Sequence, residues 1–442
     1  MKKFVLINSP LFWERTNEKE EYLSPLGLGY IATYLKKAGL EVVLLDSVKE
    51  RLGVEDILKQ VSEIEPEFVG INVFTQNYEL VQYIIEKMSI QCECFVGGQV
   101  VKSIYETILT WQTSNKVNII IGEGEFIIPA IVLENCKQKP IEHLDNKFVY
   151  KVDRNSKYFP EDISKIYLDR SFLKNEIINN HYGEKEAAII TSRGCAYDCA
   201  FCGGARGLNK DISIRMKNVE SVKHEIAEIC DLYPDLKSIR ILDDLFLRNE
   251  TSISQAADIF QEFPQLHWRG MVHILSLIKC LDKIKLLKSC NCKELFVGIE
   301  SGSNTVRKRI NKLGDISSVI AVIRELLING IDVKGYFMYG FPDEIQEDME
   351  ETYKLAYELS NISKECEGTF RPSVFQFRPY HGTRLYNEIL ERGIDIPNCH
   401  YNSSIYTLQG RSQFNFCSGN YSGVSDKILE EYIMKTQRIM EA

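Results

Sequence analysis

Three cysteines, Cys195, Cys199 and Cys202, lie within eight residues of one another. Thiolates favour iron-sulfur clusters and zinc, and these short gaps allow one loop to bring all three sulfur atoms to a single metal centre. A structural zinc site needs a fourth Cys or His close by, and none follows before His224. The spacing therefore favours a four-iron cluster with one iron open to another ligand. Zinc, or cysteines that only pack in a core, remain alternatives.

Composition narrows the class of protein that holds this motif. The chain has 442 residues, 44% of them hydrophobic, which is enough for two or three domains. Its formal net charge of -9 does not suit a phosphate backbone, so we expect no nucleic acid partner. Thirteen cysteines without a signal peptide or a long apolar run indicate reduced thiols, a cytoplasmic location and no membrane span.

Residues 1–140 alternate short apolar runs with helical patterns, which predicts a doubly wound, Rossmann-like α/β domain. The expected strands are 4–8, 42–46, 68–73, 94–97 and 118–121, and the expected helices are 26–37, 54–64, 78–88 and 103–111, with a fifth after residue 125. A ligand of such a domain binds at the C-terminal ends of the strands.

Residues 141–185 are polar and irregular, and we interpret them as a linker. Residues 186–385 form a second α/β series, with expected strands at 187–191, 238–242, 268–273, 295–299, 333–338 and 374–378. Six such units with right-handed crossovers predict a partial (β/α)6 TIM-like barrel, with chemistry at the C-terminal ends of its strands. The C-terminal region, 386–442, is expected to be small and helical, ending in a helix at 425–440.

Acidic residues also lie at the ends of the expected barrel strands. Asp243 follows one strand, in Leu-Asp-Asp-Leu-Phe, and Glu300 follows another, in Gly-Ile-Glu-Ser-Gly. Carboxylates at these positions can accept hydrogen bonds from an ammonium group or from ribose hydroxyls. The alternative is ordinary, since a strand-end Asp is often a helix N-cap and an isolated Glu is often a solvated loop charge.

Together, the motif Cys-x-x-x-Cys-x-x-Cys, with Phe201 before its last cysteine, and these strand ends resemble the radical S-adenosylmethionine (SAM) superfamily over roughly 200 residues. The resemblance implies that Cys195, Cys199 and Cys202 hold a [4Fe-4S] cluster, which cleaves SAM reductively to a 5′-deoxyadenosyl radical. It assigns no catalytic residue beyond the cluster ligands. The implied SAM contacts are Phe201, Gly203, Asp243, Glu300, Ser301 and Arg378.

In the first domain, Gly27-Leu28-Gly29-Tyr30-Ile31-Ala32 fits the pattern G-x-G-x-x-A of dinucleotide-binding proteins. The fit is weak, because a polar stretch separates the first strand from these glycines, whereas that fingerprint turns directly from strand to helix. Nicotinamide binding is therefore the lesser alternative for this domain.

The order of the strand-end loops in this domain is instead similar to the cobalamin-binding domain of the cobalamin-dependent radical SAM class. No Asp-x-His-x-x-Gly motif is present, so no histidine is offered as a lower cobalt ligand, and a domain that has lost its cofactor is the alternative. The implied cobalamin contacts are Leu26, Gly27, Thr75, Gln76, Gly97, Gly98, Gln99, Gly122 and Glu123.

The resemblance implies a cobalamin-dependent radical SAM enzyme that methylates an unactivated carbon of a small metabolite or a natural-product intermediate. Radical cyclisation or rearrangement without methyl transfer is an alternative. So, from a different class, is an iron-sulfur electron carrier or a metal-stabilised binding protein. The expected partners are a small-molecule substrate and an external electron donor resembling flavodoxin or ferredoxin.

Overall fold

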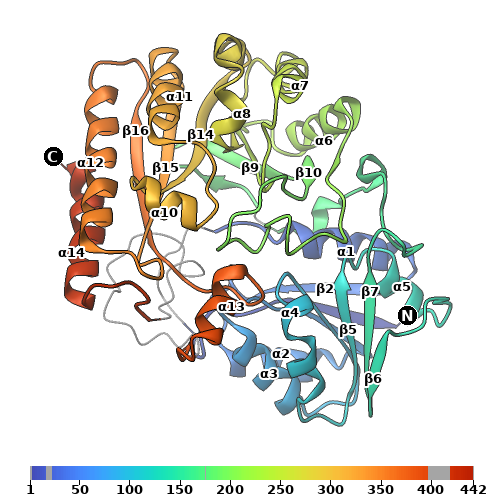
Figure 1. Cartoon of the computed structure of the whole chain (residues 1–442). Helices are drawn as coiled ribbons and strands as arrows, with labels where there is room; N and C mark the ends of the chain where they lie inside the picture. The colour runs from blue at the N-terminus through green and yellow to red at the C-terminus, as the bar shows by residue number, and fades with distance from the viewer. Residues whose placement is uncertain (1, 16–21, 175, 397–418, 442) are drawn as a thin grey trace.

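The computed structural model describes residues 2–15, 22–174, 176–396 and 419–441 (Figure 1). Two seven-stranded sheets form within these residues, one from the N-terminal part of the chain and one from its middle. Among the described residues, no helix has both the length and the apolar character that crossing a membrane would require.

The first sheet has the strand order β2-β1-β3-β4-β5-β7-β6. Strands β1 to β5 and β7 pair in parallel, whereas β6 is antiparallel to β7. The order of the first five strands is that of a flavodoxin-like doubly wound sheet. The strands are β1 (Lys3–Asn8), β2 (Glu41–Asp46), β3 (Phe68–Asn72), β4 (Glu93–Gly97), β5 (Lys116–Gly122), β6 (Glu142–Leu144) and β7 (Lys147–Val152).

Helices cover both faces of this sheet, because its central strands are apolar on both sides. One face packs against α2 (Val54–Ile64), α3 (Tyr78–Lys87) and α4 (Val101–Leu109). The other face packs against α1 (Leu26–Lys37) and α5 (Ile127–Val132). The predicted doubly wound fold is confirmed.

The segment 141–185 contains more regular structure than expected. Instead of an irregular connection, it supplies β6 and β7 to the first sheet, joined by a hairpin in which Asp145 has a φ of 53°. The expectation failed because β6 is fully exposed and so lacks an apolar signal. The division of the chain into domains at residues 140, 185 and 385 stays a prediction.

The second sheet has the strand order β16-β15-β14-β13-β12-β9-β8, and its last six strands in the sequence pair in parallel. The strands are β8 (Ile178–Asn179), β9 (Lys185–Ile189), β12 (Ser238–Ile241), β13 (His267–Val272), β14 (Cys292–Glu300), β15 (Asp332–Tyr339) and β16 (Phe370–Gln376). Helices follow these strands and cover the outer face of the sheet (Figure 1). The partial (β/α)6 barrel is confirmed.

The helices of the barrel are α6 (Val219–Leu232), α7 (Glu250–Phe260), α8 (Ile274–Leu277), α9 (Ile284–Ser289), α10 (Asn304–Arg309), α11 (Ile316–Ile328) and α12 (Gln346–Ser363). A short antiparallel pair, β10 (Ser192–Arg193) and β11 (Arg215–Met216), joins the two ends of the segment that contains the cysteine motif. The motif therefore belongs to a loop that is closed at its base.

The C-terminal part adds α13 (Arg384–Glu391) and α14 (Asp426–Gln437), the latter within the helix expected at 425–440. Helix α14 packs beside α12 and β16, at the edge of the second sheet (Figure 1). The Tyr339 and Thr436 hydroxyl oxygens are 2.7 Å apart, and Leu429 and Ile433 are fully buried there. Helix α14 thus covers the edge strand that would otherwise be open.

Candidate functional site

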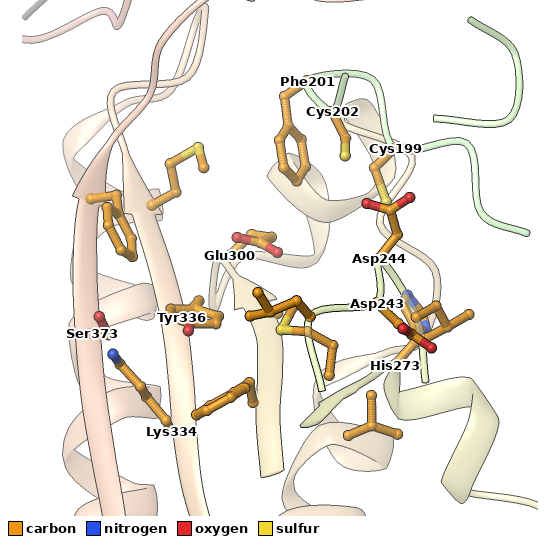
Figure 2. Close-up of a pocket in the computed structure, with 18 of the residues that line it drawn as sticks. Cys199, Phe201, Cys202, Asp243, Asp244, His273, Glu300, Lys334, Tyr336 and Ser373 are labelled. Atoms are coloured by element: carbon orange, nitrogen blue, oxygen red, sulfur yellow. The ribbon is translucent and has the colours of Figure 1, made fainter. Parts of the chain in front are cut away.

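The three cysteines lie at one end of a cavity of about 1410 Å³ inside the barrel. All three line it, and Figure 2 shows Cys199 and Cys202 at the same end as Phe201. The Ala200 amide donates to the carbonyl of Ile310 at 2.8 Å, which fixes the loop between the second and third cysteines to the end of α10. The three cysteines therefore border one cavity, and their binding of a single cluster stays a prediction.

Burial sets the protonation state of these thiols. It raises the pKa of Cys195 and Cys199, and it raises the pKa of Cys202 to about 12. Iron must therefore displace protons when it binds. Among the described residues, no three His, Cys, Asp or Glu side chains lie close enough together to share one metal ion. A cluster bound through separate irons does not need that arrangement.

The cavity reaches beyond the barrel. Leu26 and Gly27, at the start of α1 in the first domain, line it together with the cysteines and the inner faces of β12 to β16. Pockets for one small ligand have volumes of about 300–1,000 Å³. A cavity of about 1410 Å³ can therefore hold more than one ligand, in contact with both domains.

Glu300 lies at the end of β14 and faces the cavity, as predicted (Figure 2). Its Oε1 is 3.1 Å from Nζ of Lys312, and both residues are more than 90% buried. Burial opposes the charge of Lys312, but the neighbouring Glu300 carboxylate outweighs it and raises the lysine pKa. A Cβ at Gly298 would lie 2.4 Å from Glu300 Oε1, so only glycine leaves room for this pair.

Asp243, the other predicted carboxylate, is engaged by the chain itself. Its carboxylate accepts hydrogen bonds from the amide and hydroxyl of Thr191, at 2.7 and 2.6 Å, and from the hydroxyl of Ser192 at 2.6 Å. These bonds tie the end of β12 to the strand that leads into the cysteine loop. Asp243 still borders the cavity, and its neighbour Asp244 extends into it near Cys199 (Figure 2).

The other predicted SAM contacts divide into two groups. Phe201 and Arg378 line the cavity, and Gly203 lies in the cysteine loop against Gln99. Ser301, by contrast, is fully buried, and its Oγ lies 3.0 Å from the Thr352 hydroxyl oxygen. Ser301 is not among the residues that line the cavity, so the fold does not bring its hydroxyl group there.

The predicted cobalamin contacts lie together at the C-terminal edge of the first sheet, facing the barrel. Of these described residues, only Leu26 and Gly27 line the cavity. A Cβ at Gly27 would meet no atom within 4 Å, so the start of α1 offers an open surface. Gly97 and Gly122 end β4 and β5, and Gly98 follows β4. A Cβ at Gly98 or Gly122 would clash with the backbone of Val73 or Val152, so these two glycines allow neighbouring backbone segments to pack closely.

Some of the residues predicted to contact cobalamin instead contact side chains from the barrel part of the chain. Glu123 pairs with Arg193 at 2.9 Å and with Arg215, on the strands that close the cysteine loop. The Thr75 hydroxyl oxygen lies 3.1 Å from Nδ1 of His381. The Glu123 carboxylate is thus committed to two arginines, which sequence spacing could not reveal, while Gln76 lies partly exposed beside Thr75.

The glycine pattern that suggested nicotinamide binding has a structural explanation. Gly27 and Gly29 lie within α1, well separated from the end of β1, so the strand does not turn directly into this helix. A Cβ at Gly29 would lie 2.8 Å from Cδ1 of Leu168. Gly29 therefore allows close packing of the helix, and the dinucleotide fingerprint is absent from this segment.

Two family models match the chain: residues 189–356 match the radical SAM superfamily and residues 16–132 match the B12 binding domain. An uncharacterized methyltransferase of Pyrococcus horikoshii, PH0819, is 27% identical over 373 residues, which are 82% of this chain and 77% of the relative. Cytidylyl-2-hydroxyethylphosphonate methyltransferase of Streptomyces wedmorensis is 22% identical over 84% of this chain and 79% of its own.

Among solved structures, the radical SAM methyltransferase TsrM from Kitasatospora setae, with cobalamin and a [4Fe-4S] cluster bound, has the same fold. Its TM-score is 0.66, at 14% sequence identity, over 99% of this chain and 89% of that chain. A sheet domain of the cobalamin-binding type thus faces a partial barrel that carries a three-cysteine loop. The protein belongs to the radical SAM superfamily and has an N-terminal B12-binding domain.

This membership implies a [4Fe-4S] cluster, SAM and cobalamin, and the residues present can be compared with each. The three thiols at the cavity fit the cluster, since they leave one corner of it to another ligand. The buried pair of Glu300 and Lys312 beside them offers one acceptor and one donor to the polar groups of SAM. For cobalamin, the fit rests on the open start of α1 at Gly27.

Proposed function

We propose that this cobalamin-dependent radical SAM enzyme is a methyltransferase that acts on an unactivated carbon of a small metabolite or natural-product intermediate. The observation that carries the proposal is the single cavity that joins the cysteine loop to the start of α1. A methyl carrier and a radical source must both reach one carbon, and this cavity borders both domains. The two relatives described above are named as methyltransferases, which supports the same conclusion.

The chain's own residues would hold and shield the reacting groups. Cys195, Cys199 and Cys202 would bind the cluster, while the Glu300 carboxylate would accept hydrogen bonds from SAM. When bound, the cluster and SAM supply a radical that removes hydrogen from carbon, and cobalamin supplies the methyl carrier. The apolar side chains of Phe201, Met338 and Phe375 border this space and would limit the access of water.

The reaction needs electrons from outside the chain, because the cluster must be reduced by one electron before SAM is cleaved. We expect an external donor of the flavodoxin or ferredoxin kind. The substrate would enter the same cavity as a free small molecule, and we expect no nucleic acid partner since the chain carries a net negative charge.

Anaerobic purification with iron, sulfide and hydroxocobalamin, followed by incubation with dithionite and methyl-deuterated SAM, tests the proposal. We expect bound iron and cobalt, 5′-deoxyadenosine, and deuterated methyl groups in a small-molecule product. Replacing Cys195, Cys199 and Cys202 together by alanine should abolish 5′-deoxyadenosine. Cys230→Ala, on the outer helix α6, is the matched control and should retain it.

A second pair of variants tests the site at α1. Gly27→Leu adds a side chain at the open surface, whereas Gly27→Ala adds a Cβ that meets no atom within 4 Å. We expect Gly27→Leu to lose cobalt but keep iron, and Gly27→Ala to keep most of both. If the wild type binds iron and cleaves SAM but takes up no cobalt, methyl transfer is rejected and radical cyclisation or rearrangement takes its place.

A further inference from the structure

The end of the cavity that lies away from the cysteines carries positive charge on neighbouring strands. Lys334 on β15 and Arg371 on β16 are register partners, so their side chains emerge side by side from the sheet. Both line the cavity, and so does Arg240 on β12. Figure 2 shows Lys334 pointing toward Ser373 on the neighbouring strand, across the cavity from Cys199. Charged residues inside barrel strands are costly to bury and call for an explanation.

The charges that line the cavity are unevenly distributed. Among the described residues that line it, six are Lys or Arg and three are Asp or Glu. All three carboxylates lie at the cysteine end, on Asp243, Asp244 and Glu300. Below them, the buried Glu294 lies 2.6 Å from Arg371 and 2.8 Å from Arg269, and Arg269 also pairs with Glu186 at 2.6 Å. With Arg240 and Lys334, four cations there face two carboxylates. The far end of the cavity therefore has an excess of positive charge.

The layers between the two ends suggest the shape of a ligand. Along β15 and β16, the register pairs that face the cavity are Lys334 with Arg371, then Tyr336 with Ser373, then Met338 with Phe375. The Tyr336 and Phe375 rings lie 5.7 Å apart. Four residues of strand span roughly 13 Å, so the cationic layer lies about that far below the apolar layer. An elongated molecule would fit along this wall.

We propose that the substrate is an elongated organic oxyanion, a carboxylate or a phosphate ester, whose acidic group binds Lys334 and Arg371. Its body would lie along Tyr336, and its reactive carbon would lie beside Met338, near the cysteine loop. Charge-assisted hydrogen bonds from two cations to one oxyanion are strong and directional. The inference deepens the proposed function and rests on it, since it names the class of molecule that occupies the same cavity.

Direct binding to the cluster-loaded protein tests this class without any turnover. The probes are 4-phenylbutanoate, 4-phenylbutyl phosphate and the neutral 4-phenylbutanamide, measured by anaerobic calorimetry in the presence of SAM. We expect at least one oxyanion to bind about tenfold more tightly than the amide, the value for a charged hydrogen bond. Which of the two binds better distinguishes a carboxylate substrate from a phosphate ester.

Matched variants locate the effect. Lys334→Met keeps the length of the side chain and removes its charge, and we expect it to remove the oxyanion preference. Lys293→Met is the control, because Lys293 lies on β14, outside the set that lines the cavity, where it pairs with Asp332 at 3.1 Å. Lys334→Glu should reverse the preference, so that 4-phenylbutylamine binds better than the acid. Iron content and circular dichroism verify that each variant is folded.

The proposal is overturned if no oxyanion binds better than the amide, or if Lys334→Met and Lys293→Met lower oxyanion binding equally. Either result rejects the substrate class alone, provided that 5′-deoxyadenosine formation and cobalt uptake are intact. Loss of those two activities would reject the proposed function instead, whatever the binding data show.

Discussion

The ion pair between Arg193 and Glu125 connects the cysteine loop to the first domain and can be tested quantitatively. The Arg193 guanidinium lies 2.6 Å from Glu125 and 2.9 Å from Glu123, and it precedes Cys195 by two residues. Burial opposes the charge of Arg193, but the two carboxylates outweigh it and raise its pKa. We predict that removing this arginine loosens both the interface and the loop.

The size of the effect follows from burial. The Arg193, Glu123 and Glu125 side chains are 18%, 14% and 6% exposed, so the pair is close to a buried one, for which removing one partner costs about 3–5 kcal/mol. Arg193→Met should cost about 3 kcal/mol, since Glu123 retains Arg215. Glu125→Gln should cost about 2 kcal/mol, and the double variant little more than Arg193→Met alone. The coupling energy is then about 2 kcal/mol.

The assay is urea unfolding of the cluster-loaded protein under anaerobic conditions, followed by intrinsic fluorescence and by the visible absorption of the cluster. With a slope near 3 kcal/mol/M, Arg193→Met should lower the midpoint by about 1 M. The cluster absorption should be lost at lower urea than the fluorescence changes. If the costs of the two single variants add in the double variant, the pair is not coupled and the reasoning is refuted.

Two further predictions concern stability. Gly122 has a φ of 100°, and a Cβ there would lie 2.2 Å from the Val152 carbonyl oxygen, so Gly122→Ala should cost at least about 2 kcal/mol in urea unfolding. Burial raises the pKa of Glu344 to about 8, so between about pH 4.5 and pH 8 the folded state holds a proton that the unfolded state has lost. The free energy of unfolding of the wild type should therefore fall as the pH rises through this range. Glu344→Gln should remove that slope, and an unchanged slope would exclude Glu344 as its source.

Sequence patterns predicted the fold well where apolar periodicity was strong. In strands that are covered on both faces, such as β5 and β14, nearly every residue between the strand ends is buried. The hairpin of β6 and β7 was missed, although Asp145-Asn146 lies between them and Lys147–Val152 is rich in residues that favour strands. Strand β6 buries no residue that could have marked it as a strand.

The site was predicted as far as local motifs allow. The cysteines, Phe201 and Glu300 line the cavity as expected, because short spacing or a strand end determines where they lie. Lys312, which pairs with Glu300, has no local signal, since it lies on the loop after α10 and reaches the site only through the fold. For the same reason, sequence alone could not show that Glu123 faces Arg193.

One signal in the sequence did mark the far end of the cavity. Arg240, Lys334 and Arg371 are charged residues inside β12, β15 and β16, and hydrophobic periodicity alone assigns them no role. The register of the strands brings these residues close together in the fold. Lys334 lies beside Arg371 on β16 and beside Phe296 on β14. Arg240 and Arg269 lie 5.0 and 5.4 Å from the centre of the Phe296 ring, and Lys334 is the register partner of Phe296. Charges that look isolated along the chain thus form one surface, which faces the cavity where the radical would form.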